Sequence, residues 1–375
     1  MNGRTRWVAR HRRRYVLRYY KKHDAFTISS CEKDDIDDLR AFFNEQWMQN
    51  HIIYIDKEFL DWQYFNKRHD NYNFIIARDY SSGEIIGEAG FIPNYIFDYS
   101  IDGDEKFIWF STWRMRSDYQ KRSSLGIELL TTIPVIENTR NMGVPGIYET
   151  VAPLYKTLKF DTGCLDHFFV LNEDVHDYKI AEIPEGYTFK IRRSGTYSEI
   201  EVIGQDLFEY ILSEVMEKDR ISYPRKTKEY FINRYYNHPI YKYEALLVRT
   251  GGEPVAILIF RTAKHDGATA LRIVDGFGDY NSIGNIYDGL QKLLSNRGSE
   301  YVDIYCKGVS ADALVNAGFT AHIISDDIVI PNFFEPFVRE NKNIYFAFYN
   351  KGKRPYTIFK ADGDQDRPSI YHIRK

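Results

Sequence analysis

The sequence predicts a mixed α/β protein made of two copies of one unit, each a mostly antiparallel twisted sheet flanked by helices. Three observations support this fold class. The chain has 375 residues, which is long for one domain. Apolar residues recur at helix spacing and strand spacing in an alternating order. Two stretches of the chain also match each other at a constant offset, which indicates an internal repeat.

The repeat has an offset of 171 residues and preserves the order of its segments. At this offset KEFLDWQYFNK (57–67) matches KEYFINRYYNH (228–238) and NFIIAR (73–78) matches EALLVR (244–249); later in the chain, and at a shorter offset, GVPGIYE (143–149) has a counterpart in GSEYVDIY (298–305). A polar stretch at 172–186 contains Pro184 and Gly186 and marks the seam. We therefore expect a leader at 1–24, a first domain at 25–178 and a second domain at 179–375.

The elements of the first copy follow from its apolar pattern. Ile36, Leu39 and Phe43 recur at helical spacing, and a Ser-Ser-Gly turn separates the first two apolar strands. In order, we expect helices at 33–48 and 57–66, strands at 73–79, 84–92 and 106–115, a helix at 124–140, a strand at 146–150, a short helix at 152–158 and a closing strand at 165–171.

The composition excludes several classes of protein. The three cysteines, Cys31, Cys164 and Cys306, are far apart, so neither a disulfide framework nor a cysteine metal site is predicted. The histidines form no ligand cluster, and we expect no metal. No stretch reaches the ~18 apolar residues of a membrane span. A reducing cytoplasm fits these features best.

The N-terminal leader is basic. The first 23 residues hold nine Arg or Lys and no acid, interleaved with Trp7, Tyr15 and Leu17. Residues 4–22 suit peripheral contact with the anionic inner face of a membrane, and they equally suit a solvated leader. Because the whole chain carries a net charge of −3, the remainder is acidic, which argues against a protein that binds nucleic acid specifically.

A polar, basic loop opens the predicted helix at 124–140. Residues 114–126 are RMRSDYQKRSSLG, and they directly follow an aromatic strand. The first N–H groups of a helix have no partner within the helix, and its dipole is positive at that end, so such a loop suits a phosphate. An ordinary solvated turn is the other interpretation.

This loop and order of elements resemble the GCN5-related N-acetyltransferase (GNAT) superfamily, in which a loop Arg/Gln-x-x-Gly-x-Gly/Ala holds the pyrophosphate of acyl-coenzyme A. The match is degenerate, since Ser124 stands where the first glycine belongs and either Lys121 or Gln120 stands where Arg or Gln belongs. The resemblance implies two tandem GNAT-like domains with acetyl-CoA or another acyl-CoA as co-substrate. The coenzyme-binding residues it implies are Trp113, Met115, Arg116, Gln120, Lys121, Arg122, Ser123, Ser124, Leu125 and Gly126.

A second motif, APLYKTLKF (152–160), resembles the family's short helix that carries a tyrosine near the coenzyme sulfur. The resemblance implies that Tyr155 protonates the departing thiolate; packing of a short helix is the alternative. Lys159 replaces the usual glycine, so we expect this end of the helix to be built differently. For the general base we expect Glu149 or Glu88, unless these carboxylates lie on the surface or pair with Arg114 or Arg116.

The second copy lacks these features. Its counterpart of the loop, GFGDYNSIG (276–284), has no Lys or Arg, and Leu314 stands in place of Tyr155. We expect a degenerate domain that forms one wall of the acceptor site. Near the C-terminus, Asp364, Asp366 and Arg367 lie in DGDQDRP (362–368), where we expect them to bind an acceptor; a turn held by local Asx bonds is the alternative.

That ending resembles tandem acetyltransferase-like proteins of bacterial surface-polysaccharide gene clusters. The implied function is N-acylation of an amino group on a small-molecule acceptor, a nucleotide-linked amino sugar. Two alternatives stay open. One is a Fem-like transferase that uses aminoacyl-tRNA, which the basic leader would favour. The other is a non-catalytic binding or scaffold protein with this fold, which the degenerate loop would favour.

Overall fold

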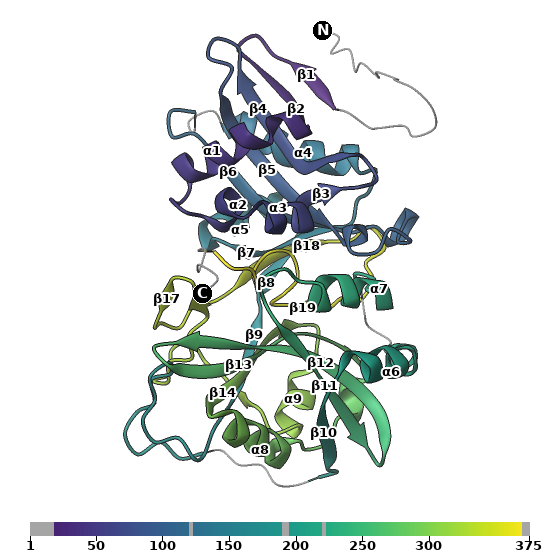
Figure 1. Ribbon diagram of the computed structural model, residues 1–375, viewed down its shortest axis with the longest axis vertical. Helices are drawn as coiled ribbons and strands as arrows, with labels where there is room; N and C mark the ends of the chain where they lie inside the picture. Colours follow the sequence, from purple (N-terminus) through teal and green to yellow (C-terminus); the bar gives the residue numbers. More distant parts are fainter. Residues whose placement is uncertain (1–18, 120–122, 190–194, 220–222, 370–375) are drawn as a thin grey trace. The chain divides into compact units, whose positions relative to one another are not determined.

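The predicted fold class is confirmed. The computed structural model describes residues 19–119, 123–189, 195–219 and 223–369. These residues form two mixed sheets flanked by helices (Figure 1). The chain divides into two compact units, Met1–Val144 with Phe348–Gly352 and Pro368–Lys375, and Pro145–Ala347 with Lys353–Arg367. This division at 144/145 differs from the expected domain boundary at 178/179.

The first unit contains a sheet whose neighbours are antiparallel except for one parallel pair, β6 with β7. Its strands lie in the order β1 (Tyr20–Lys22), β2 (Phe26–Cys31), β4 (Asn71–Asp79), β5 (Ile85–Pro93), β6 (Ile108–Met115) and β7 (Met142–Ile147), and β3 (Phe65–Asn66) pairs with β4. The helices are α1 (Ile36–Gln46), α2 (Ile52–Ile55), α3 (Lys57–Tyr64) and α4 (Ser123–Ile136), with 3-10 turns η1 (Lys33–Asp35), η2 (Asn94–Ile96) and η3 (Gly103–Glu105). Helix α4 packs on β4, β5 and β6.

The second unit contains a sheet that is also mostly antiparallel, and its parallel pair is β13 with β14. Its strands lie in the order β10 (Ser198–Ile203), β11 (Tyr243–Thr250), β12 (Glu253–His265), β13 (Ala268–Gly278), β14 (Ser299–Lys307), β9 (Asp166–Leu171) and β15 (Thr320–Ala321), and β19 (Ile358–Phe359) pairs with β14. The helical elements are η4 (Glu149–Val151), α5 (Ala152–Thr157), α6 (Gln205–Lys218), α7 (Lys228–Phe231), η5 (Ile232–Tyr236), η6 (Tyr280–Ser282), α8 (Tyr287–Arg297) and α9 (Ala311–Asn316). The remaining strands of this unit are β8 (Asp161–Cys164), β16 (Phe333–Phe334) and β17 (Phe337–Val338), and β18 (Tyr345–Tyr349) spans the division after Ala347.

The segments that repeat in sequence fall on matching elements. The first pair falls on α3 and on α7 with η5, the second on β4 and β11, and the third on β7 and β14. Each copy of the repeat then has the succession strand, strand, strand, helix, strand, short helix: β4, β5, β6, α4, β7, α5 in the first copy and β11, β12, β13, α8, β14, α9 in the second. Figure 1 labels both successions.

Two expected boundaries in the first copy were wrong. The helix expected at 124–140 ends at Ile136, and Asn138 follows with a left-handed φ of 49°, which is incompatible with continued helix. The strand expected at 146–150 spans Met142–Ile147 instead, so Glu149 begins the turn η4 rather than ending a strand. The glycines and the proline in this strand weaken its sequence signal.

The strand expected to close the first unit belongs to the second sheet. Strand β9 pairs antiparallel with β14, with Val170 opposite Val302 and Phe168 opposite Ile304. Both faces of β9 are buried, because Phe168 and Val170 join one apolar cluster while Phe169 and Leu171 join another. Apolar alternation predicted a strand here, but it does not specify the partner.

The end of α5 corrects a further expectation. Lys159 adopts a left-handed φ of 66°, and the Phe160 N–H donates to the Tyr155 carbonyl at 3.0 Å. In the second unit Gly318, with φ 105°, precedes Phe319, whose N–H donates to the Leu314 carbonyl at 3.0 Å. The two helices therefore end in the same way, and Lys159 occupies the position that favours glycine. Among the described residues, no helix is long and apolar enough to cross a membrane.

Candidate functional site

Strand β6 contains a bulge at the centre of the first unit. Ser111 and Thr112 together oppose Gly90 of β5, since the register shifts between Ala89–Trp113 and Phe91–Phe110. A Cβ on Gly90 would lie 2.3 Å from Thr112 Oγ1, so a larger residue would not fit there. A bulge bends its strand and changes where the following side chains point, and bulges are common beside functional sites.

Strands β6 and β7 pair over a short distance. The parallel register covers Ile108 with Met142 and Trp109 with Gly143. Among the described residues, no further pair joins β7 to residues 110–115. An unpaired strand edge presents backbone N–H and C=O groups that an extended ligand with amide groups can bind. This edge includes the residues expected beside the coenzyme, Trp113 and Met115, which are both half-buried.

Helix α4 starts directly beside this edge. The Trp113 indole Nε1 donates to the Gly126 carbonyl at 3.1 Å. A Cβ on Gly126 would lie 3.0 Å from the Trp113 ring, so glycine allows this close approach of helix and strand. The contact places the beginning of α4, including exposed Ser124 and buried Leu125, next to β6. The first N–H groups of the helix and its dipole make this end suitable for an anion.

Part of the predicted loop lies outside the described residues, namely Gln120, Lys121 and Arg122, and so does the side chain of Ser123. Arg116 is described, and it forms ion pairs with Glu84 at 2.5 Å and Asp118 at 3.3 Å. The hydrogen bond from Arg116 to Glu84 raises the pKa of Arg116. A phosphate bound by Arg116 would compete with these two carboxylates. Arg114 lies over the Trp47 ring instead, at 5.2 Å from its centroid.

Glu88 is the one expected proton acceptor in the first unit. It lies on β5 opposite Arg114 and is fully buried. The Thr112 hydroxyl donates to Glu88 Oε2 at 2.8 Å, so the carboxylate is tied to the bulge of β6. Glu88 therefore lies beside β6, the strand that also carries Trp113 and Met115, which are expected to bind the coenzyme. Sequence reasoning missed Thr112, because a threonine in an aromatic strand carries no signal of its own.

Tyr155 and Glu149 lie in the second unit. Tyr155 is buried in α5, with its ring 5.2 Å from the Phe160 ring. Burial raises the pKa of Tyr155, so its hydroxyl stays protonated at neutral pH. Glu149 is exposed at the start of η4 and interacts with the Tyr345 hydroxyl. The expected roles of Tyr155, Glu149 and Glu88 remain predictions.

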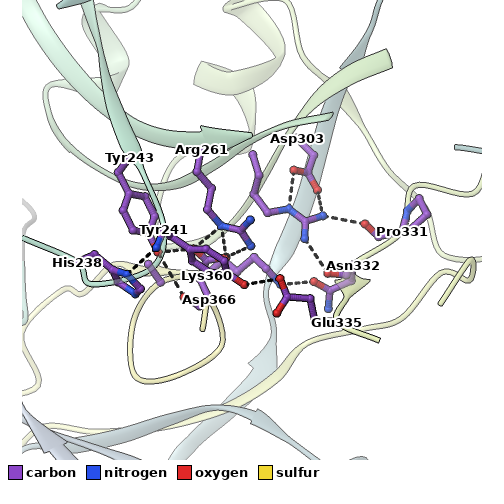
Figure 2. A network of polar contacts seen from close by, with 12 residues as sticks. His238, Tyr241, Tyr243, Arg261, Asp303, Pro331, Asn332, Glu335, Lys360 and Asp366 are labelled. Atoms are coloured by element: carbon purple, nitrogen blue, oxygen red, sulfur yellow. Dashed lines mark hydrogen bonds and ion pairs between the residues drawn. The ribbon is translucent and has the colours of Figure 1, made fainter. Parts of the chain in front are cut away.

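The acidic C-terminal segment is buried in the second unit, and Figure 2 shows its residue Asp366 beside Arg261 and Tyr243. Asp366 accepts from Arg261 Nη2 at 2.8 Å and from Arg261 Nε at 3.0 Å, and also from the Tyr243 hydroxyl at 2.9 Å. Asp364 pairs with Arg367 at 3.0 Å. These contacts already neutralise the charges of Asp364, Asp366 and Arg367. The expectation that these three residues bind an acceptor stays a prediction.

Sequence reasoning missed Arg261, which lies more than a hundred residues before Asp366. The signal that could have revealed it is its place at the end of the apolar run VAILIF, in a strand buried on both faces. A charged residue within such a strand needs a buried partner of opposite charge. Within the described residues, no group of three or more His, Cys, Asp or Glu is placed to hold a metal ion.

The fold is similar to that of two solved structures with little sequence similarity. One is a GCN5-related N-acetyltransferase from Anabaena variabilis ATCC 29413, with 11% identity and a TM-score of 0.51. The other is a conserved protein of unknown function from Enterococcus faecalis V583, described as "Probable N-Acyltransferase", with 8% identity and a TM-score of 0.52. Each similarity covers 86% of this chain and 72% of the other. No protein-family model and no curated protein sequence matches the chain.

Proposed function

We propose that this protein is an acyl-CoA-dependent N-acyltransferase whose first unit binds the coenzyme along β6 and at the start of α4. The observation that carries the proposal is the arrangement of these two elements. The β6–β7 pairing covers Ile108 and Trp109, and the Trp113–Gly126 contact holds the helix beside the remaining strand edge. Pantetheine amides would pair with the strand, and the pyrophosphate would meet the helix N-terminus. The fold shared with the Anabaena acetyltransferase supports the same proposal.

In the proposed reaction the acceptor amine attacks the thioester carbonyl, and the carbon–sulfur bond breaks as the amide forms. The ammonium proton passes to Glu88 or Glu149, directly or through water, and Tyr155 supplies a proton to the thiolate. Most of the rate enhancement would come from positioning the two substrates and from polarising the carbonyl with backbone N–H groups. The proposal includes acetyl-CoA as the donor and two tandem GNAT-like domains, which the matching element order of the two copies of the repeat supports.

The proposed acceptor is the amino group of a nucleotide-linked amino sugar, used in the synthesis of a surface polysaccharide. The resemblance of DGDQDRP (362–368) to proteins of polysaccharide clusters carries this part of the proposal. Screening amino sugars with and without the nucleotide, by release of the coenzyme thiol, would test it.

Calorimetric titration with acetyl-CoA and with coenzyme A tests the coenzyme site. We expect micromolar binding by the wild type and loss of binding in the double variant Lys121→Ala/Ser124→Asp, because this variant removes a cation and places an anion at the helix N-terminus. The matched control is Lys264→Ala/Ser213→Asp, which makes the same change of charge at exposed positions of the second unit and should bind like the wild type.

If the folded wild type bound neither ligand, the loop at 114–126 would be an ordinary turn and the proposal would be wrong. Loss of activity after ribonuclease treatment would then favour transfer from aminoacyl-tRNA. If acetyl-CoA bound but Tyr155→Phe and Lys121→Ala left function in cells intact, the chain would be a binding protein rather than an enzyme.

A further inference from the structure

A short segment near the C-terminus, residues 357–362, is buried inside the second unit. All six of its side chains are at most 6% exposed, although Lys360 and Asp362 are ionisable. The segment includes the two-residue strand β19, Ile358–Phe359. It therefore cannot be a surface tail, and its backbone groups need partners within the fold.

The segment finds these partners on both strands of the parallel pair. Ile358 and Phe359 pair antiparallel with Lys307 and Cys306 of β14. The Lys360 N–H then donates to the Tyr305 carbonyl of β14 at 3.2 Å. The N–H of the next residue, Ala361, donates to β13 instead.

The Ala361 N–H donates to the Val274 carbonyl of β13 at 2.9 Å. Strands β13 and β14 themselves pair up to Ile273 with Ile304. Residues 360 and 361 thus bind the two strands at the positions that immediately follow the end of their own pairing. The segment fills the gap that opens between them.

This gap corresponds to the coenzyme edge of the first unit. In both units the third strand of the succession is bulged, at Ser111–Thr112 in β6 and at Val274 in β13. In both units the parallel partner pairs with the part of the strand that precedes the bulge. The Val274 carbonyl, which belongs to the bulge, is the group that accepts from Ala361.

Buried charges fix the segment in place. Asp362 Oδ2 accepts from the Phe359 N–H at 2.8 Å, and Asp362 Oδ1 lies 3.0 Å from Lys226 Nζ. Lys226 also binds both carboxylate oxygens of Asp275, at 2.7 and 2.8 Å. Lys360 extends in the other direction and donates to the Asn332 side chain (Figure 2).

We propose that residues 357–362 occupy, in the second unit, the place that the coenzyme takes in the first, so that the chain has a single acyl-CoA site. The comparison of the two places rests on the proposed function, whereas the occupation of the gap rests on the hydrogen bonds alone. The chain itself supplies the backbone partners that pantetheine amides would otherwise provide. An exchange of this occupant for coenzyme would require breaking the buried Lys226–Asp362 pair.

Two measurements on the full chain test the proposal. Calorimetric titration with coenzyme A should give one site per chain, and Lys121→Ala/Ser124→Asp should leave none. Hydrogen exchange of the Lys360 and Ala361 amides should be at least 100-fold slower than exchange of the Gly251 and Gly252 turn amides, and coenzyme A should not change it.

The outcomes of the titration and of the exchange measurement each support or overturn the proposal. Two sites in the wild type, or one site that survives in the loop variant, would overturn the proposal and leave the proposed function standing. Exchange of Lys360 and Ala361 as fast as in the turn, or faster exchange on adding coenzyme A, would also overturn it. If nothing bound, the proposed function would fail, and slow exchange of these two amides would still show that the segment fills the gap.

Discussion

Asp303→Asn is expected to lower the free energy of unfolding by about 3–5 kcal/mol, because it leaves a buried guanidinium without its charge partner. Arg272 Nε donates to Asp303 Oδ1 at 3.0 Å, and Arg272 Nη2 donates to Oδ2 at 2.7 Å. Neither residue is more than 1% exposed. The other Arg272 donors bind the carbonyls of Pro331 and Asn332 (Figure 2), so the guanidinium could reach water only by breaking these bonds as well.

The pH dependence of this effect has a definite sign. Burial by itself would raise the pKa of Asp303, but the Arg272 guanidinium and His167 outweigh burial and hold the pKa at about 2. The folded-state pKa is thus below the ordinary value of 3.8. The stabilisation is complete above about pH 4 and is lost as the pH falls through about 2. The difference in stability between wild type and variant should shrink across that window.

Urea denaturation followed by circular dichroism measures this loss. The control is Arg297→Gln, which breaks the exposed ion pair between Arg297 and Glu244 and should cost about 1 kcal/mol or less. If Asp303→Asn lost no more stability than this control, the buried pair would not stabilise the second unit as described.

Tyr155→Phe is expected to reduce kcat by about 100-fold or more and to leave the affinity for acyl-CoA unchanged. Phenylalanine keeps the ring against Phe160, so packing of α5 should be preserved. The hydroxyl is lost, and with it the proposed proton donor to the thiolate. Release of the coenzyme thiol from acetyl-CoA, in the presence of an amine acceptor, measures kcat.

The matched control for this variant is Tyr148→Phe. Tyr148 lies seven residues earlier in the same unit and is 77% exposed, so its hydroxyl has no expected role. The control should have wild-type activity. Wild-type activity in Tyr155→Phe as well would mean that Tyr155 only packs the short helix.

The order of elements could be predicted from the sequence because apolar periodicity is local. Helices α1 and α3 and strands β4, β5 and β6 lie where the pattern placed them. The partner of a strand is not local information, which is why β9 was assigned to the wrong sheet. Strand β19 has two residues, and its burial depends on Lys226 and Asp275, which are distant in the chain.

Part of the candidate site could also be predicted, because it is formed by residues that are neighbours in the sequence. The loop, Gly126 and the strand before them are contiguous, so their proximity follows from the sequence. The Glu84 partner of Arg116 lies 32 residues away, and the Thr112 partner of Glu88 lies 24 residues away. Such pairs depend on strand register, which the apolar pattern alone does not fix.

The proposed acyl-CoA site lies along β6 and at the start of α4, and amide hydrogen exchange with and without coenzyme A is the sharpest test of it. We predict slower exchange at residues 113–116 and 123–126 in the presence of the coenzyme and unchanged exchange at residues 357–362. Protection elsewhere, with residues 113–116 and 123–126 unaffected, would contradict the proposed site.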